Sequence, residues 1–215
     1  MTTKFRNILH TLVIFLIITF LLNSKILSNF LWAMPELFSD FSAVINWLEC
    51  DSLGFNLITL ESINCGTGKT IGQFNYGYAI LYIPYNEFLS IFYRTYLPWI
   101  LIFTFIYLTL KIINPKNKIE IILVYLALLN PSTMLLVERM QLDCLFYIVI
   151  IFTVYNRLYF INWFLGVYFA LIKIYPIIIL LNIFIENKNR NIKKIFFITL
   201  LLLITLIIYL FFNRE

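Results

Sequence analysis

Seven apolar segments, most of them with few or no charges, divide the 215-residue sequence. Segments of this kind are typical of membrane helices, although several are short for a hydrocarbon core of about 30 Å. With 62% hydrophobic and only 13% charged residues, the chain is far more apolar than a soluble domain. We therefore expect an all-α polytopic integral membrane protein with about seven transmembrane or half-length helices. The expected spans lie near residues 8–27, 95–113, 119–136, 142–155, 158–172, 174–185 and 192–212.

Basic residues fall between the apolar segments, and their distribution predicts a topology. The formal charge is +5, but no basic stripe interleaves with aromatic residues, so we expect no nucleic-acid partner. A cytoplasmic N-terminus, with a chain break between Lys173 and Pro176, places 10 of the 16 basic residues on the cytoplasmic side. One long helix from Arg157 to Ile185 would instead put the cluster at residues 188–194 outside. The charges therefore favour a hairpin of two half-length helices, in a plasma (inner) membrane protein.

Three regions form one expected membrane domain. The first apolar segment resembles a signal peptide, but no small-residue cleavage site follows it, which indicates an uncleaved first span within residues 1–27. An extracytoplasmic loop occupies residues 28–94, and a bundle of membrane helices occupies residues 95–215.

The extracytoplasmic loop differs from the cytoplasmic loops in charge. It carries six acidic residues and a single lysine between residues 28 and 92, the reverse of the cytoplasmic balance. Its apolar stretches at 37–48 and 79–92 predict helices that lie at the membrane interface.

Two cysteines, Cys50 and Cys65, fall in this loop, where an oxidising compartment permits a disulfide. Two unpaired thiols are the alternative, and the sequence leaves both open. Cys144 begins a membrane helix and is expected to serve packing.

Four polar features share the predicted outer side of the membrane. They are the acidic loop, the "FNYG" stretch at 74–77, the "ERMQLD" turn at 138–143, and Lys173 with Tyr175. The turn follows a helix that we expect to be interrupted at Asn130 and Pro131. Simpler interpretations exist, because the charges of a solvated turn pair with one another and a lysine at a helix end snorkels to the interface.

Together these features suit a lipid-linked sugar phosphate. Cations such as Lys173 and Arg139 would hold the phosphate through charge-assisted hydrogen bonds. A loop carboxylate would accept a proton from an acceptor hydroxyl as that oxygen attacks the anomeric carbon. This chemistry strictly requires neither a metal nor a cofactor. A single histidine in the whole chain argues against hydrolases that use a Ser-His-Asp triad.

The same residues carry a family resemblance. The sequence resembles the GT-C superfamily of membrane glycosyltransferases, most closely glycosyltransferase family 87, the polyprenyl-phosphate-mannose-dependent mannosyltransferases and their bacterial relatives. "SDFSAVINWL" at 39–48 is similar to the family's Asp-Phe motif, which implies that Asp40 is the catalytic base. "FNYGYAILYIP" at 74–84 is similar to its Tyr-Pro-Pro stretch, with Tyr76 matching and Gly77 departing from proline.

Two further motifs follow in the family's order. "VERMQLDCLFYIVIIF" at 137–152 resembles its Arg-x-Gln turn, with Arg139 and Gln141 in the matching places. "ALIKIYPIIILL" at 170–181 matches its Lys-x-x-Pro element through Lys173, Tyr175 and Pro176. The resemblance runs from about residue 36 to 186. Since GT-C enzymes usually continue through further helices, we expect a truncated, split or minimal member.

This resemblance implies transfer of a sugar from a polyprenyl-phosphate donor to a glycan or lipid acceptor at the outer membrane face. Lys173, Arg139 and Tyr175 would bind the donor phosphate, and Tyr76, Gln141 and Glu138 the substrate. Asp51 remains a second candidate for the catalytic base. The alternative is a noncatalytic membrane protein, either a transporter-like or flippase-like subunit or an inactive GT-C remnant. Against a transporter, the polar groups cluster at one face and no repeat is visible.

Overall fold

The computed structural model describes most of the chain between residues 3 and 173 and a few positions beyond it. Its regular structure is helical throughout, and these residues form no β-strand. The all-α class expected from the sequence is therefore confirmed for this part of the chain. The described residues are 3–24, 37–57, 65, 78–155, 159–173, 193, 197, 199–201 and 204.

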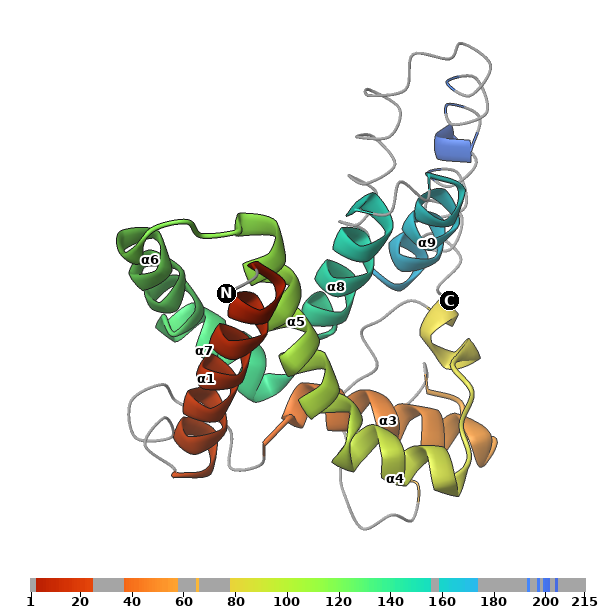
Figure 1. Cartoon of the computed structure of the whole chain (residues 1–215). Coiled ribbons are helices and arrows are strands. Elements are labelled where there is room, and N and C mark those ends of the chain that lie inside the picture. The colour runs from red at the N-terminus through yellow and green to blue at the C-terminus, as the bar shows by residue number, and fades with distance from the viewer. Residues whose placement is uncertain are drawn as a thin grey trace. The chain divides into compact units, whose positions relative to one another are not determined.

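The helices follow the apolar segments of the sequence closely (Figure 1). The segment predicted at 119–136 is two helices instead of one, as the interruption at Asn130 and Pro131 predicted. The helices are α1 Thr3–Asn23, α3 Ser39–Ser52, η1 Tyr78–Tyr82 (a 3-10 helix), α4 Glu87–Thr95, α5 Leu97–Ile113, α6 Lys118–Leu128, α7 Pro131–Arg139, α8 Leu142–Tyr155 and α9 Tyr159–Ile172.

Asparagine side chains fix the starts of three of these helices. Asn86, Asn117 and Asn130 each precede a helix with extended backbone, and each side-chain oxygen accepts a hydrogen bond from a backbone N–H in the first turn at 2.8 Å. Asparagine is among the best N-cap residues because its side chain satisfies an otherwise unpaired N–H. Pro131 follows its cap at the first helical position, where the missing N–H costs nothing. Local sequence therefore determines where α4, α6 and α7 begin.

Helices α1 and α5 pack side by side and form the centre of the larger described unit. Ile14 and Ile18 of α1 and Ile102 and Ile106 of α5 are fully buried. Phe15 makes edge-to-face ring contacts with Trp99 and Phe103 at 6.2 and 5.6 Å between centroids. Burial of each large apolar side chain contributes about 1.5–3 kcal/mol.

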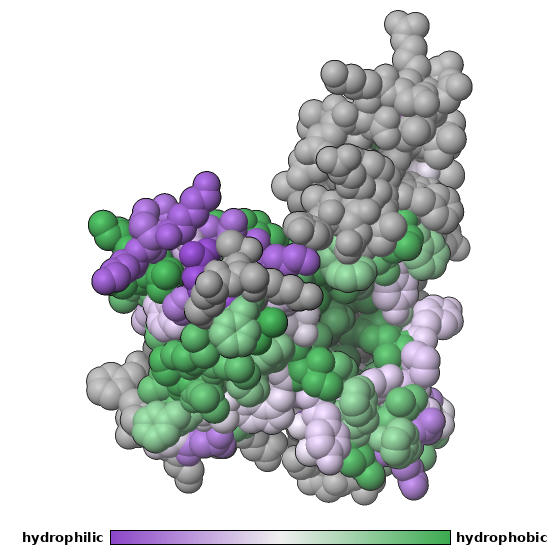
Figure 2. Space-filling model, in the orientation of Figure 1, coloured by the Kyte–Doolittle hydropathy of each residue, from purple (hydrophilic) through white to green (hydrophobic). Residues whose placement is uncertain are grey.

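The two helices run in opposite directions, so the start of α1 and the end of α5 lie at the same end of the unit (Figure 1). His10 Nδ1 lies 3.0 Å from the Tyr125 hydroxyl and brings α6 to that end as well. Arg6, Lys111 and Lys116 therefore gather there. In Figure 2 hydrophilic side chains collect over this end, while apolar side chains cover the exposed side of α1.

One helix of the described chain, α1 from Phe5 to Asn23, is long and apolar enough to cross a membrane by itself. Its 19 residues rise about 28 Å, close to the thickness of a hydrocarbon core. The pairs α4–α5 and α6–α7 also pass if each is one span, but they bend by 45° and 52° at their junctions. The described residues thus provide one span, or up to three, and the expected total of about seven stays a prediction. The expected spans at 174–185 and 192–212 lie mostly outside these residues.

The chain divides into two compact units. The larger comprises residues 1–74 and 84–149, and the smaller residues 75–83 and 150–215. Within the smaller unit, the Tyr168 hydroxyl of α9 donates a hydrogen bond to the Ala79 carbonyl of η1 at 2.9 Å. Residues far apart in sequence therefore belong to one unit.

Candidate functional site

The candidate site is built around the N-terminus of α3. Phe41, Val44 and Ile45 bury one side of this helix, and Asp40 lies half-buried in its first turn. A carboxylate in this position is stabilised by the N-terminal end of the helix dipole, typically by about 0.3–1 kcal/mol. The burial pattern of α3 therefore fixes Asp40 at an end that already favours negative charge.

A backbone hydrogen bond joins this helix end to the end of α7. Phe38, the residue before α3, donates its N–H to the Glu138 carbonyl at 2.7 Å. Phe38 has left-handed backbone geometry with φ of 60°, and its buried ring meets Trp99 edge-to-face at 5.1 Å. The carbonyls of a last helical turn have no partner within their own helix. One of them is satisfied here by a segment 100 positions earlier in the chain.

The turn after α7 has a defined shape. Met140 closes the helix in left-handed geometry with φ of 50° and donates its N–H to the Val137 carbonyl at 3.2 Å. Gln141 donates its N–H to the Leu136 carbonyl at 3.3 Å, as in a Schellman-type helix ending. Glu138 is consequently buried with 2% of its surface exposed, while Arg139 is half-buried.

The structure brings together only part of the predicted site. Asp40 and the group Glu138, Arg139 and Gln141 lie on two contacting segments joined by the Phe38 hydrogen bond. Asp51 lies exposed at the opposite end of α3, about 16 Å away for 11 residues of helix. The two candidate bases therefore occupy separate places, and only Asp40 is next to the Arg139 turn.

The remaining predicted residues belong to the other unit or lie outside the described residues. Lys173 belongs to the smaller unit, directly after the last residue of α9, and donates its N–H to the Phe169 carbonyl at 2.8 Å. Helix α9 ends at Ile172, as the expected span at 158–172 predicted, and the rest of the expected break lies outside the described residues. Tyr76, Tyr175 and Pro176 lie outside the described residues.

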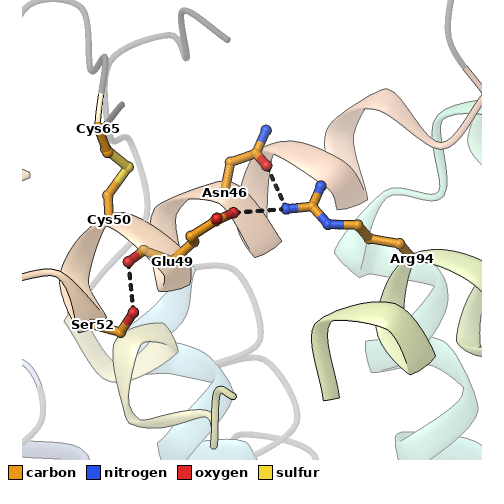
Figure 3. The surroundings of a disulfide bond; sticks show 6 residues. All are labelled: Asn46, Glu49, Cys50, Ser52, Cys65 and Arg94. Atoms are coloured by element: carbon orange, nitrogen blue, oxygen red, sulfur yellow. Dashed lines mark hydrogen bonds and ion pairs between the residues drawn. A yellow bond between two sulfur atoms is a disulfide. The ribbon is translucent and has the colours of Figure 1, made fainter. Parts of the chain in front are cut away.

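A second polar cluster was not predicted from the sequence. Arg94 of α4 donates a hydrogen bond to Asn46 Oδ1 at 2.6 Å and forms an ion pair with Glu49 at 3.2 Å (Figure 3). Asn46 is buried, and Arg94 and Glu49 each expose 30% of their side chains. The available signal was the spacing of Asn46 and Glu49, which places both on one face of a helix. Their basic partner lies just beyond the acidic stretch of the loop.

The disulfide is formed by Cys50 and Cys65, whose Cα atoms are 5.5 Å apart (Figure 3). Both residues are buried. Of the two alternatives that the sequence left open, the structure has the bonded one. Since Cys50 follows Glu49 directly, the disulfide ties the loop to the same end of α3 as the Arg94 cluster.

In chemical terms, the site offers a carboxylate, a guanidinium and an amide on neighbouring helix ends. Such a set can accept a proton and bind an anionic group. Within the described part of the chain, no three His, Cys, Asp or Glu side chains gather as metal ligands would. Comparison with protein-family models, curated proteins and solved structures finds no match to this chain.

Proposed function

We propose that this protein transfers a sugar from a polyprenyl-phosphate donor to a glycan or lipid acceptor at the extracytoplasmic face of the plasma membrane. The observation that carries the proposal is the hydrogen bond from Phe38 to Glu138. It brings the Asp40 turn next to the Arg139 turn, two sequence-distant segments to which the GT-C resemblance gives complementary roles. A carboxylate and a cation in one place are what glycosyl transfer from a lipid phosphate needs.

In the proposed reaction Asp40 accepts the proton of the acceptor hydroxyl. That oxygen forms a bond to the anomeric carbon, while the bond from this carbon to the phosphate oxygen breaks. Polyprenyl phosphate leaves with the bonding electron pair, and the charge of Arg139 stabilises it. The family resemblance assigns the same role to Lys173. Tyr175 assists in phosphate binding. The sequence expectation assigns contacts with the sugar or the acceptor to Tyr76, Gln141 and Glu138.

The proposed topology agrees with the ends of the larger unit. Arg6 at the start of α1, Lys111 at the end of α5 and Lys116 just after it belong to one end of the unit, which we assign to the cytoplasm because of the positive-inside rule. Asp40 and Trp99 lie toward the other end of α5. The loop that contains α3 and α4 then faces outward, and a polytopic arrangement follows if the bent helix pairs each act as spans.

The test uses protein purified in detergent and mixed with a native lipid extract that carries radiolabelled polyprenyl-phosphate sugar. Wild type is expected to move the label to an acceptor, and Asp40→Asn to abolish the transfer. Asp51→Asn is the matched control, because it makes the same change about 16 Å away on the same helix. Full activity of Asp40→Asn would remove Asp40 from the mechanism.

Donor binding is measured separately from transfer. Arg139→Met and Lys173→Ala each remove a charge-assisted hydrogen bond of about 1.5–3 kcal/mol, so the Kd for the donor, measured by equilibrium binding, should rise about tenfold to a hundredfold. Wild type that binds the donor but transfers nothing would favour the noncatalytic alternative. Unchanged donor affinity in both variants would exclude the phosphate site.

A further inference from the structure

Helix α4 is anchored to the protein by its polar side. Arg94 reaches Asn46 and Glu49 of α3, and its Nε donates to the Ser90 hydroxyl at 3.3 Å one turn earlier. Ser90 and Arg94 lie four positions apart and therefore share one face. The side of α4 with Ser90 and Arg94 thus points toward the protein, while Glu87 and Thr95 are exposed.

A second side of α4 is exposed and carries two large apolar side chains. Phe88 exposes 77% of its surface and Ile91 62%. These residues lie three positions apart on one face of the helix. Phe92 stacks on Tyr96, which is 58% exposed, at 6.3 Å between ring centroids. No residue of α4 is fully buried. Two large apolar side chains of α4 are therefore exposed, whereas a usual surface helix packs such side chains inward.

The connection to α5 identifies the environment that covers this face. Helices α4 and α5 meet at Tyr96 with a 45° bend, and together they pass as one broken membrane span. Ile100, on the first turn of α5, is 49% exposed. An apolar surface therefore continues from α4 across the bend to a helix that is itself apolar. Tyr near the end of such a helix is enriched at the boundary between headgroups and acyl chains, and Phe is common on the apolar face of helices that lie in this boundary.

We infer that the exposed face of α4, formed by Phe88, Ile91 and Tyr96, inserts into the outer headgroup–acyl boundary of the lipid bilayer. Because Arg94 binds α3, the insertion depth of α4 then also fixes the depth of α3, the helix that carries Asp40. The inference deepens the proposed function, because a lipid-linked donor presents its phosphate at the same depth. The inference rests on the proposed function only for the assignment of α4 to the extracytoplasmic side of the membrane.

Spin labels on introduced cysteines test the insertion. The native thiols do not interfere, because Cys144 is buried and Cys50 and Cys65 are bonded. Phe88→Cys and Ile91→Cys are labelled and reconstituted into vesicles of phosphatidylethanolamine and phosphatidylglycerol. Collision rates with oxygen, which partitions into lipid, are compared with those of a water-soluble nickel chelate. Ser52→Cys, at the exposed end of α3, is the aqueous reference, and Ile100→Cys is the lipid reference.

The ratio of oxygen to nickel collisions at residues 88 and 91 is expected to lie several-fold above Ser52→Cys and below Ile100→Cys. A ratio equal to that of Ser52→Cys would place the face in water and overturn the inference. Protection from both reagents would mean that protein covers the face, and would overturn it too. The sugar-transfer assay is independent, so an inactive protein with inserted labels would reject the proposed function alone.

Discussion

Phe38 and Glu138 are 100 positions apart in the sequence, yet the N–H of one donates to the carbonyl of the other at 2.7 Å. The bond joins the start of α3 to the end of α7, and the Phe38 ring packs against Trp99 in the same place. Two helix ends that lack partners of their own therefore stabilise each other. Asp40 and Arg139 take their positions from this junction.

Removing the Phe38 ring should weaken the junction. Phe38→Ala deletes a side chain with 6% of its surface exposed, and we expect it to lower the free energy of unfolding by about 3–5 kcal/mol. The matched control is Phe88→Ala, the same change at a side chain that is 77% exposed. Thermal unfolding in detergent measures both variants. Equal losses would show that the ring contact with Trp99 contributes nothing specific.

Arg94 should be important for holding α4 on α3. Arg94→Met leaves the buried Asn46 amide without its donor, so we expect a loss of about 1–3 kcal/mol in the free energy of unfolding. Glu49→Gln keeps a hydrogen-bond acceptor and removes only a partly exposed ion pair, so it should cost about 1 kcal/mol or less. Urea unfolding followed by fluorescence measures both. A larger effect of Glu49→Gln would assign the stability to the ion pair instead of to Asn46.

The disulfide should stabilise the loop that follows α3. Its cysteines are 15 positions apart, so the Cys50→Ser, Cys65→Ser double variant should lose about 3 kcal/mol of unfolding free energy. Dithiothreitol should reproduce the loss in wild type and have no effect on the double variant. Cys144→Ala is the control, since it keeps the disulfide and should keep the response to reductant. A wild type indifferent to reductant would contradict the prediction.

Reporter fusions test the predicted topology. Fusions after Lys116 and Arg190 should report the cytoplasm, because both follow basic segments, and a fusion after Met140 should report the outside. Alkaline phosphatase and green fluorescent protein give opposite signals at each position. An outside signal at Arg190 would reject the hairpin at Lys173, and an inside signal at Met140 would separate the Arg139 turn from the extracytoplasmic loop.

The sequence predicted the helices better than their partners. Apolar runs located the helices, and Asn130 with Pro131 placed the interruption between α6 and α7, because capping depends on neighbouring residues alone. The ion pair of Arg94 with Glu49 could not be predicted in the same way, since α3 and α4 are separated by a long loop. The sequence showed the charge of each of these residues and the helix face on which it lies, but it did not show which residue would be its ion-pair partner.

For the candidate site, the sequence supplied the residue types and the structure supplied their neighbourhood. The Asp-Phe motif favoured Asp40 as the base and left Asp51 second, but no residue near either one distinguished a base from a solvated carboxylate. Their positions at opposite ends of α3 separate them, because only the N-terminal end meets the Arg139 turn.

The sequence by itself determined the helical class, the extent of most helices and the end of α9 before Lys173, because hydropathy and capping act over a few residues. The tertiary structure alone decided that Phe38 caps α7, that Arg94 binds α3, and that Cys50 bonds Cys65. These contacts join segments distant in the chain. They form because buried polar groups must find partners, wherever in the sequence those partners lie.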